Sequence, residues 1–336
     1  MPRLIKVLSI DGGGIRGIIP AMVLAEIERR CSKPIAKIFD LIAGTSTGGI
    51  LALGLTKPNG KSQPQYSAEK LIKLYENKGK QIFDRSIFRT FKLIPEGTQP
   101  LVKRKYPSRG IEEVLHEYFQ ETNLSEALKE VLITSYDIEQ RSPYFFKRSK
   151  ALKSKHHDFP MQKVARATSA APTYFEPLKL ETSDPLVDYY ALIDGGVFAN
   201  NPALCAYVEA KTTFPDATDF LVVSLGTGEL AQRLPYDEVK EWGIIQWAQP
   251  MLNVTFDGVS DTVDYQLREL LPVAADGSKR YYRLQTDKLE RGNHIDDASE
   301  KNIHSLKLLA QEIINNPNRD LDKLCDLLKQ TAPSNS

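Results

Sequence analysis

The 336-residue chain has little cysteine, no excess of charge of either sign and no long hydrophobic run. Cys31, Cys205 and Cys325 stand far apart, so the sequence offers neither a framework of several disulfides nor a C-x-x-C zinc site. Lysine and arginine number 44 against 43 acidic residues, a balance that argues against a protein that coats a nucleic-acid polymer. We therefore predict a reduced, cytoplasmic setting.

Neither a signal peptide nor a membrane-spanning segment is expected. The apolar run 4–10 is interrupted by Lys6 and closed by Asp11, which leaves too short a hydrophobic region for a leader. The most apolar stretch, 39–55, contains Asp40 and four glycines, and a spanning helix needs roughly 18 apolar residues in a row.

Strands and helices alternate along the first part of the chain. Residues 4–10 and 40–45 predict buried strands, and each is followed by a tight turn and then a helix, over 18–31 and 47–55. This order is typical of an α/β fold with a parallel sheet. Further strands are expected over 130–138, 144–147, 189–193 and 220–225, and further helices over 67–83 and 108–119, capped by Ser67 and Ser108, and over 161–171.

No stretch rich in proline, glycine or serine marks a confident domain boundary. We expect one α/β domain over 1–240 and a helical C-terminal extension, 241–336, packed on the same domain. Within the extension, 281–284 is expected to be an edge strand. Residues 84–107 predict an irregular, basic segment.

The strongest local signal is Gly44-Thr45-Ser46-Thr47-Gly48, a G-x-S-x-G motif between an apolar strand and an apolar helix. A strand-to-helix turn this sharp puts the serine into a strained conformation, and Gly44 and Gly48 let the neighbouring chains pass. The helix that follows directs its N-terminal N–H groups at the same point. Ser46 is thus predicted to be a nucleophile; the alternative is a flexible turn without chemistry.

A second signal is the sequence DGGGIRG, which follows the first strand and opens the first helix. The backbone N–H groups of Gly12–Gly14 could bind an anion or a developing oxyanion, with Arg16 as a positive charge nearby. The same letters match the dinucleotide fingerprint G-x-G-x-x-G. A dinucleotide site also wants an acidic residue at the end of the second strand, where this chain has Ser46.

A third signal is Asp194-Gly195-Gly196, which ends a short apolar strand and is followed by Asn200-Asn201-Pro202. An aspartate on such a turn can be held rigidly and partly dry. The alternative is a solvated turn residue, which is the commoner fate of Asp-Gly pairs.

Together, DGGGIRG, GTSTGG and DGG resemble the patatin-like phospholipase family in their order and spacing. The segments ATSAAPTYFEP (167–177) and VSLGTG (223–228) and the asparagine pair before Pro202 are also similar to family sequence. The resemblance covers roughly residues 4–230. It implies a three-layer α/β sandwich with a central, mostly parallel sheet flanked by helices, in which 1–240 is the catalytic domain.

The resemblance also implies the chemistry. The chain would hydrolyse phospholipid acyl esters as a phospholipase A-type enzyme, with Ser46 as the nucleophile and Asp194 as its base. The oxyanion hole would be made by Gly12, Gly13 and Gly14 with Arg16, and the turns would be shaped by Gly44, Gly48, Gly195 and Gly196. No metal or other cofactor is expected, since the sequence has no calcium loop and no H-E-x-x-H motif.

The substrate surface is expected to be a phospholipid membrane, which the active enzyme would touch peripherally. Basic residues over 141–157 and 78–109, including Lys103-Arg104-Lys105, could draw it to an anionic membrane or hold a phosphate-bearing activator. A solvated loop surface is the alternative. Some bacterial family members are antiphage effectors switched on by cyclic oligonucleotides, and by that analogy alone such an activator is predicted here.

Four alternatives remain open from the sequence, and the first is the nucleotide-binding oxidoreductase that the G-x-G-x-x-G match would allow. A lipid-binding module on the same fold would have no turnover. An acyltransferase would use the same residues, because hydrolysis and transfer share the acyl-enzyme. A catalytic triad in the order serine, acid, histidine could be completed by His294 or His304.

Overall fold

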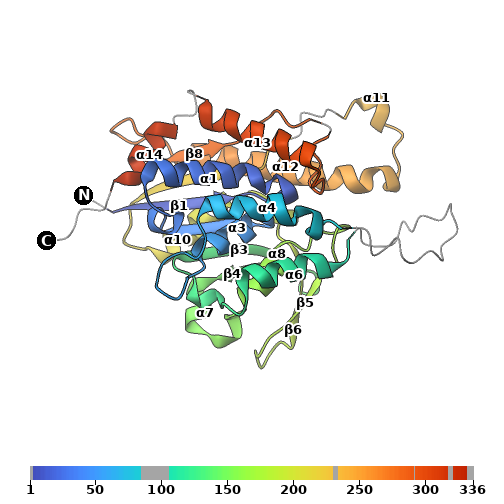
Figure 1. Cartoon of the computed structure of the whole chain (residues 1–336), viewed down its shortest axis with the longest axis horizontal. Coiled ribbons are helices and arrows are strands. Elements are labelled where there is room, and N and C mark those ends of the chain that lie inside the picture. The colour runs from blue at the N-terminus through green and yellow to red at the C-terminus, as the bar shows by residue number, and fades with distance from the viewer. Residues whose placement is uncertain (1–2, 85–105, 230–233, 291, 317–320, 331–336) are drawn as a thin grey trace.

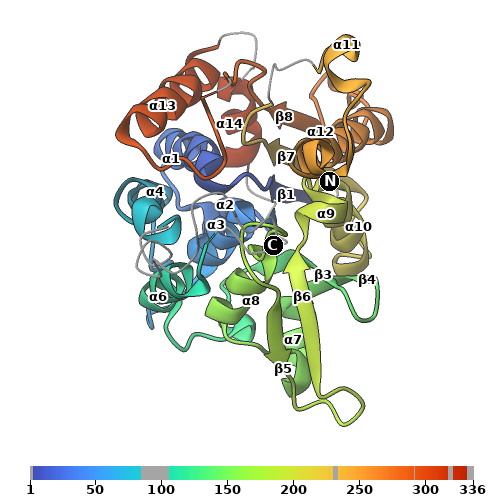
Figure 2. The same cartoon turned by 90° about the vertical axis from the view of Figure 1, so that its right-hand side faces the viewer.

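The computed structural model describes residues 3–84, 106–229, 234–290, 292–316 and 321–330. In these residues a mixed sheet of eight strands is covered by helices on both faces, which confirms the predicted α/β class and layering (Figures 1 and 2). The strands are β1 (Leu4–Ile10), β2 (Leu41–Thr45), β3 (Glu130–Asp137), β4 (Ser142–Lys147), β5 (Leu178–Glu181), β6 (Tyr189–Asp194), β7 (Asp219–Leu225) and β8 (Tyr281–Leu284).

Helices fill most of the remaining described chain. They are α1 (Ile18–Cys31), α2 (Ile35–Ile38), α3 (Thr47–Thr56), α4 (Ala68–Ile82), α6 (Ser108–Phe119), α7 (Arg148–Lys153), α8 (Met161–Thr168), α9 (Gly196–Ala199), α10 (Ala203–Thr213), α11 (Tyr236–Val239), α12 (Ile244–Leu270), α13 (Glu300–Asn315) and α14 (Leu321–Lys329). A short 3-10 helix, Gly14–Gly17, leads into α1.

The central strands run parallel, in the order β3-β2-β1-β7-β8. Their carboxyl ends therefore meet at one edge of the sheet, the usual place for a site in an open α/β fold. In Figure 1, β1 starts beside the N-terminus at the left, so these carboxyl ends lie at the right.

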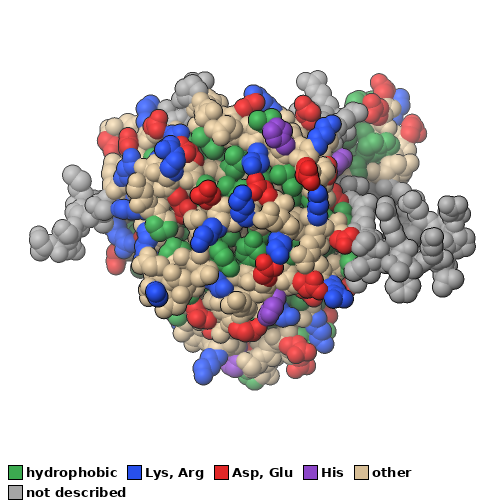
Figure 3. Space-filling model, in the orientation of Figure 1, with side chains coloured by type: hydrophobic (Ala, Val, Ile, Leu, Met, Phe, Trp, Pro, Cys, Tyr) green, Lys and Arg blue, Asp and Glu red, His purple; other side chains and the backbone are tan. Residues whose placement is uncertain are grey.

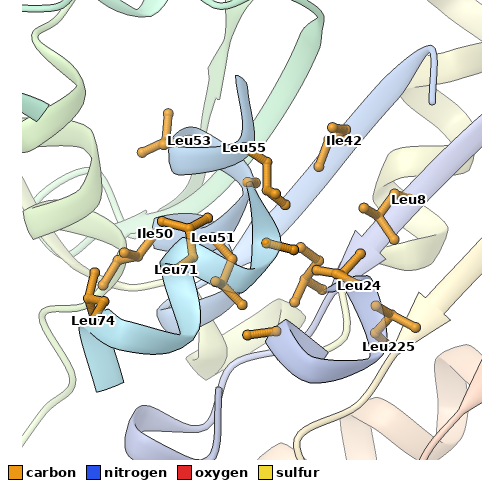
Figure 4. Close-up of a cluster of buried hydrophobic side chains, with 14 of the residues drawn as sticks. Leu8, Leu24, Ile42, Ile50, Leu51, Leu53, Leu55, Leu71, Leu74 and Leu225 are labelled. Atoms are coloured by element: carbon orange, nitrogen blue, oxygen red, sulfur yellow. The ribbon is translucent and has the colours of Figure 1, made fainter. Parts of the chain in front are cut away.

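Side chains alternate between the two faces of β1 and form two separate cores. Leu8 and Ile10 join the larger core, beneath α1, α3 and α4 (Figure 4). Ile5 and Val7 join the smaller core, beneath α10 and α12. Both faces of the central strands are buried, which explains why they read as continuous apolar runs in the sequence.

The C-terminal segment packs closely on the rest of the chain. Its strand β8 extends the sheet beside β7, and its helices α13 and α14 pack on α1. The Lys6 ammonium group of β1 donates hydrogen bonds to the carbonyls of Leu328 (2.7 Å) and Gln330 (2.6 Å). These bonds satisfy carbonyl groups at the end of α14 that have no partner within the helix.

Several predicted elements have the bounds that the structure shows, among them the strand 4–10, the helix 18–31 and the edge strand 281–284. The Ser67 cap is confirmed, since its side chain accepts a hydrogen bond from the N–H of Lys70. The Ser108 cap is wrong: Pro107 holds the cap position, and the Ser108 hydroxyl instead donates to Glu176 at 2.6 Å. Strand β5 was not predicted, and the basic run 103–105 lies outside the described residues.

Candidate active site

Strand β3 brings the loops after β2 and β6 together. Thr45, the last residue of β2, lies opposite Thr134, and Asp194, the last residue of β6, lies opposite Ser135. Because β4 occupies the other edge of β3, β2 and β6 share one edge and run toward each other along it. The sheet register therefore places Ser46 and Asp194 side by side, although they are 148 positions apart in the sequence.

Ser46 stands on the sharp turn that the motif predicts. Its φ of 54° and ψ of −122° lie in a region that side chains other than glycine rarely adopt. A Cβ on Gly48 would overlap the carbonyl of Ile10, so only glycine fits there. The strained turn is held by Thr168 of α8, whose Oγ1 accepts the Ser46 N–H at 2.8 Å.

Asp194 is buried, with 2% of its surface exposed. Its N–H donates to the carbonyl of Ala170 at 3.0 Å, and the Gly196 N–H donates to its Oδ1 at 2.7 Å. Ser46 lines the same pocket as this carboxylate. Burial raises the pKa of Asp194 to about 7, although the Ser46 hydroxyl and the Gly196 N–H act to lower it. A carboxylate with this pKa is a far better proton acceptor than an ordinary aspartate.

The glycine loop after β1 faces this pair, but not all of its amides are free. The Gly12 N–H donates to the carbonyl of Asn200 at 3.1 Å, and the Gly12 carbonyl accepts the Thr227 hydroxyl at 2.6 Å. Gly14 has a φ of +58° and lies against the carbonyl of Ile295, which only glycine allows. Among the described residues nothing accepts the N–H groups of Gly13 and Gly14, and both glycines line the pocket with Ser46.

Arg16 lies elsewhere. Its side chain is buried in a separate small cavity beside Asp257 and Glu229, and it is not among the described residues that line the Ser46 pocket. Burial lowers the pKa of Arg16 to about 10, while Asp257 acts to raise it. The guanidinium predicted to assist the oxyanion thus lies against α12 rather than beside the hydroxyl.

An apolar pocket of about 710 Å³, including its open mouth, connects Ser46 and Asp194 to the surface. Aliphatic and aromatic side chains from α4, α6 and the segment after α8 form most of its wall: Leu74, Tyr75, Ile82, Ile111, Tyr174 and Phe175. Phe256 and Ile295, from the C-terminal segment, complete it. The pocket suits an acyl chain.

A buried ion pair between Asp11 and Arg283 holds the start of the glycine loop. Asp11 and Arg283 are 2% and 6% exposed, and Arg283 Nη2 lies 2.6 Å from Asp11 Oδ2. Arg283 of β8 also donates to the Ser224 hydroxyl at 2.9 Å. Burial raises the pKa of Asp11 to about 6, with Arg283 acting to lower it. No motif in the sequence pointed to Arg283, because the pair joins residues 272 positions apart.

Three supporting residues lie in segments that the sequence had marked only as similar to the family. Thr168 holds Ser46, and Asn200 and Thr227 hold Gly12. Each contact joins distant parts of the chain, so a motif could suggest these residues but not their contacts. Phe256 and Ile295 carried no signal at all.

The alternative roles find no support in the placement of their residues. His294 and His304 are exposed, whereas Asp194 is buried and accepts the Gly196 N–H. Asp40 is at the opposite end of β2 and binds Arg3, so it cannot serve as a ribose-binding acid at the glycine loop. Over the residues described, no cluster of three His, Cys, Asp or Glu side chains could hold a metal ion, and none of the helices is both long and apolar enough to cross a membrane.

Part of the basic segment 141–157 lies toward the start of β3, on the side away from the strand ends that carry the site. Lys147 pairs with Leu132 near the start of β3, whereas the site lies beyond Thr134. The ammonium of Lys147 is 2.5 Å from Glu209, and Arg148 is 2.9 Å from Glu130. These two charges are therefore partly neutralised within the protein.

Comparisons with known proteins agree on one family. A family model described as patatin-like phospholipase matches residues 8–207. "Probable inactive patatin-3-Kuras 1" of Solanum tuberosum is 33% identical over 336 aligned residues, covering 93% of this chain and 87% of the relative. Patatin-like protein 2 of Arabidopsis thaliana is also 33% identical, covering 94% of this chain and 84% of the relative.

Among solved structures, VipD from Legionella pneumophila aligns with 93% of this chain and 67% of its own, at 10% identity and a TM-score of 0.37. That score is too low to support an inference. The family model covers more than half of the chain, and both named relatives align over nearly all of it. The chain therefore belongs to the patatin-like phospholipase family and is a lipid acyl hydrolase.

Proposed function

We propose that this chain cleaves the acyl esters of membrane phospholipids with a Ser46–Asp194 dyad and an oxyanion hole made by the glycine loop. The observation that carries the proposal is that the strained Ser46 and the buried Asp194 lie side by side and line one apolar pocket. A nucleophilic hydroxyl, a base and an apolar site for the acyl chain are what ester hydrolysis requires.

In the first half of the reaction, the Ser46 oxygen attacks the ester carbonyl carbon while Asp194 takes the hydroxyl proton. The negative charge that develops on the carbonyl oxygen is stabilised by the N–H groups of Gly13 and Gly14, which are fixed before substrate arrives. The tetrahedral intermediate then breaks its carbon–oxygen bond to the glycerol. Asp194 returns the proton to that oxygen, so a lysophospholipid leaves and the acyl chain stays on Ser46.

In the second half, Asp194 takes a proton from water, and the resulting hydroxide attacks the acyl-enzyme. The second intermediate collapses, the proton passes from Asp194 to the Ser46 oxygen, and a fatty acid leaves. A carboxylate can perform both transfers because the pKa of Asp194 is raised by burial to about 7, close to the working pH.

Product analysis tests the proposal directly. Native protein incubated with mixed phospholipid vesicles is expected to release fatty acid and lysophospholipid in equal amounts, detected by mass spectrometry. A fluorophosphonate probe is expected to label the native protein on Ser46 and to leave Ser46→Ala unlabelled. Equal turnover by Ser46→Ala and native protein would rule out this nucleophile.

The same experiments decide between the remaining candidates. A lipid-binding module would bind vesicles and release nothing, an outcome to be checked because one relative carries the word inactive in its name. An acyltransferase would yield acylated alcohol when an acceptor such as glycerol is added. If His294 or His304 completed a triad, replacing it with alanine would stop turnover as completely as Ser46→Ala.

Activation by a cyclic oligonucleotide remains a proposal that rests on family analogy alone. The test is hydrolysis of vesicles with and without a panel of cyclic di- and trinucleotides. A rise in rate with one member of the panel supports the switch, and an unchanged rate with all of them removes it.

A further inference from the structure

One end of the molecule carries exposed apolar side chains that no described part of the protein covers. They lie on α11 and the first half of α12, which project beyond the body at the end where the parallel strands finish (Figure 1). The exposed residues are Tyr236, Met251 and Val254, and Trp242 and Trp247 beside them are half-buried; we call these five residues the hairpin patch. Tyr236 is 77% exposed, Met251 49% and Val254 48%.

The residues of the hairpin patch lie close together and can act as one surface. Trp247, Met251 and Val254 recur at the spacing of one helix face. Trp242 packs edge-on against Trp247, with ring centroids 5.3 Å apart. These are both of the tryptophans in the chain. Figure 3 shows green side chains gathered at this end of the molecule, beside acidic ones.

The patch is continuous with the substrate pocket. Phe256 follows Val254 by two positions, and its ring turns inward, where it lines the pocket with Ser46 and lies over Gly196. One stretch of α12 therefore has two apolar faces. The inner face forms the wall of the acyl pocket, and the outer face is open to solvent.

The second half of α12 behaves differently. Val263 and Leu267 are buried against the sheet and α10, with 9% and 0% of their surface exposed. Packing within the protein thus explains Val263 and Leu267, although Tyr265 and Leu270 of the same half are exposed. It does not explain the exposed Met251 and Val254 of the first half. A surface of tryptophan, tyrosine, methionine and valine beside an acyl pocket suits a bilayer interface, where aromatic rings are enriched.

We propose that the hairpin patch docks on the surface of a phospholipid bilayer and so delivers lipid to the Ser46 pocket. The inference rests on the proposed function, because a lipid held in a bilayer can reach Ser46 only if this end of the molecule faces the membrane. The projecting hairpin then meets the membrane before the pocket does. Its apolar side chains enter the interface, and Phe256 leads from there into the acyl pocket.

The charged residues around the hairpin patch indicate whether it would dock on zwitterionic or on anionic lipid. Asp237, Glu238 and Glu241 outnumber Lys240, the one basic residue on the described part of the hairpin. Lys147 and Arg148, which could attract anionic lipid, lie toward the start of β3, away from the strand ends that carry the site. Docking by the patch therefore depends on apolar burial and works on zwitterionic phosphatidylcholine without anionic lipid.

Tryptophan fluorescence reports docking directly, because both tryptophans lie in the patch. The test uses full-length Ser46→Ala, which leaves the vesicles intact, and phosphatidylcholine vesicles with brominated acyl chains. Quenching that saturates with lipid supports the proposal. Vesicle binding without quenching places the contact on another face and overturns it, as does an absence of binding.

A matched pair of variants, made in the active protein, provides the second measurement. Met251→Ser with Val254→Ser is expected to lower vesicle hydrolysis by about tenfold relative to hydrolysis of p-nitrophenyl butyrate, a water-soluble ester. Tyr265→Ser, 67% exposed on the same helix and about 20 Å further along, serves as the control with an unchanged ratio. An unchanged ratio in the double variant overturns the docking proposal. Loss of butyrate hydrolysis by the native protein would instead point to failure of the proposed chemistry.

Discussion

The loops after β1 and β6 each bury an aspartate at the same end of the sheet, but only one of the two carboxylates is paired with a cation among the described residues. Asp11 faces the guanidinium of Arg283 at 2.6 Å, whereas Asp194 accepts the Gly196 N–H and forms no ion pair with any described residue. Burial raises the pKa of both, Asp11 to about 6 and Asp194 to about 7. A buried carboxylate that is paired with a cation has a structural role. A buried carboxylate without such a partner is costly in free energy to keep ionised, and groups of this kind are common at catalytic sites.

The largest expected effect is on turnover. Asp194→Asn keeps the shape of the side chain but removes the base, so hydrolysis of p-nitrophenyl butyrate should fall by about ten-thousandfold, as for other lost catalytic carboxylates. Thermal melting would show that the variant is folded. A residual rate within tenfold of the native enzyme would mean that Asp194 is not the base.

The second prediction concerns the other loop. Arg283→Met leaves the Asp11 carboxylate buried without its cation, and we expect the free energy of unfolding to fall by about 3–5 kcal/mol in urea titrations. The double variant Asp11→Asn, Arg283→Met removes both charges and should recover much of that loss. If the double variant is as unstable as the single one, packing rather than charge accounts for the effect.

The third prediction contrasts the two aspartates through pH. In the folded state the pKa of Asp194 is about 7, above its value of 3.8 in the unfolded chain, so the folded protein holds this proton more tightly. The contribution to stability is complete below pH 4 and is lost as pH rises toward 7. Asp194→Asn should therefore be more stable than the native protein at pH 8, on the order of 2 kcal/mol, and equal to it near pH 4.

The corresponding substitution at the paired carboxylate supplies the contrast. Against the effect of burial, Arg283 holds the pKa of Asp11 to about 6, below that of Asp194, so Asp11→Asn should gain less stability at pH 8 than Asp194→Asn does. Urea titrations of native protein and both variants at pH 4.5, 6 and 8 give all the values needed. A gain at pH 8 for Asp11→Asn as large as that for Asp194→Asn would contradict the distinction between the loops.

A fourth prediction concerns the pH dependence of catalysis, which the ionisation of Asp194 should also control. Asp194 must be ionised to accept the Ser46 proton, so kcat/KM for p-nitrophenyl butyrate should rise with an apparent pKa of about 7 and level off above pH 8. Well below that pKa the rate should change by about tenfold for each pH unit. A flat profile from pH 5 to 8 would indicate a base with the pKa of an ordinary aspartate.

The sequence alone was sufficient for the residues that carry a local pattern. The turn at Ser46 follows from a strand, two glycines and a helix, all within residues 41–56, and the structure has the strained φ of 54° there. The parallel strands likewise followed from apolar runs such as 4–10. Asp194 was named by its motif, but its burial and its position beside Ser46 depend on the register of β6 along β3.

What the sequence could not supply are contacts between distant segments. Gly12 was expected to donate to an oxyanion, but its N–H is taken by Asn200, 188 positions later. Ser108 resembled a helix cap, yet its hydroxyl is engaged by Glu176 and Arg166 instead. Propensity and motif describe a residue in its local chain, and tertiary partners can override both.

The smallest predicted effect tests how firmly the glycine loop must be held. Thr227→Val keeps the shape of the side chain but removes the hydroxyl that donates to the Gly12 carbonyl at 2.6 Å, a bond worth about 1 kcal/mol. In the proposed mechanism Gly13 and Gly14 bind the oxyanion only in the transition state, so we expect kcat to fall several-fold while KM stays constant. Thr227→Ser retains the hydroxyl and should restore kcat. A rise in KM at constant kcat would show that the loop positions the ground-state ester rather than the oxyanion.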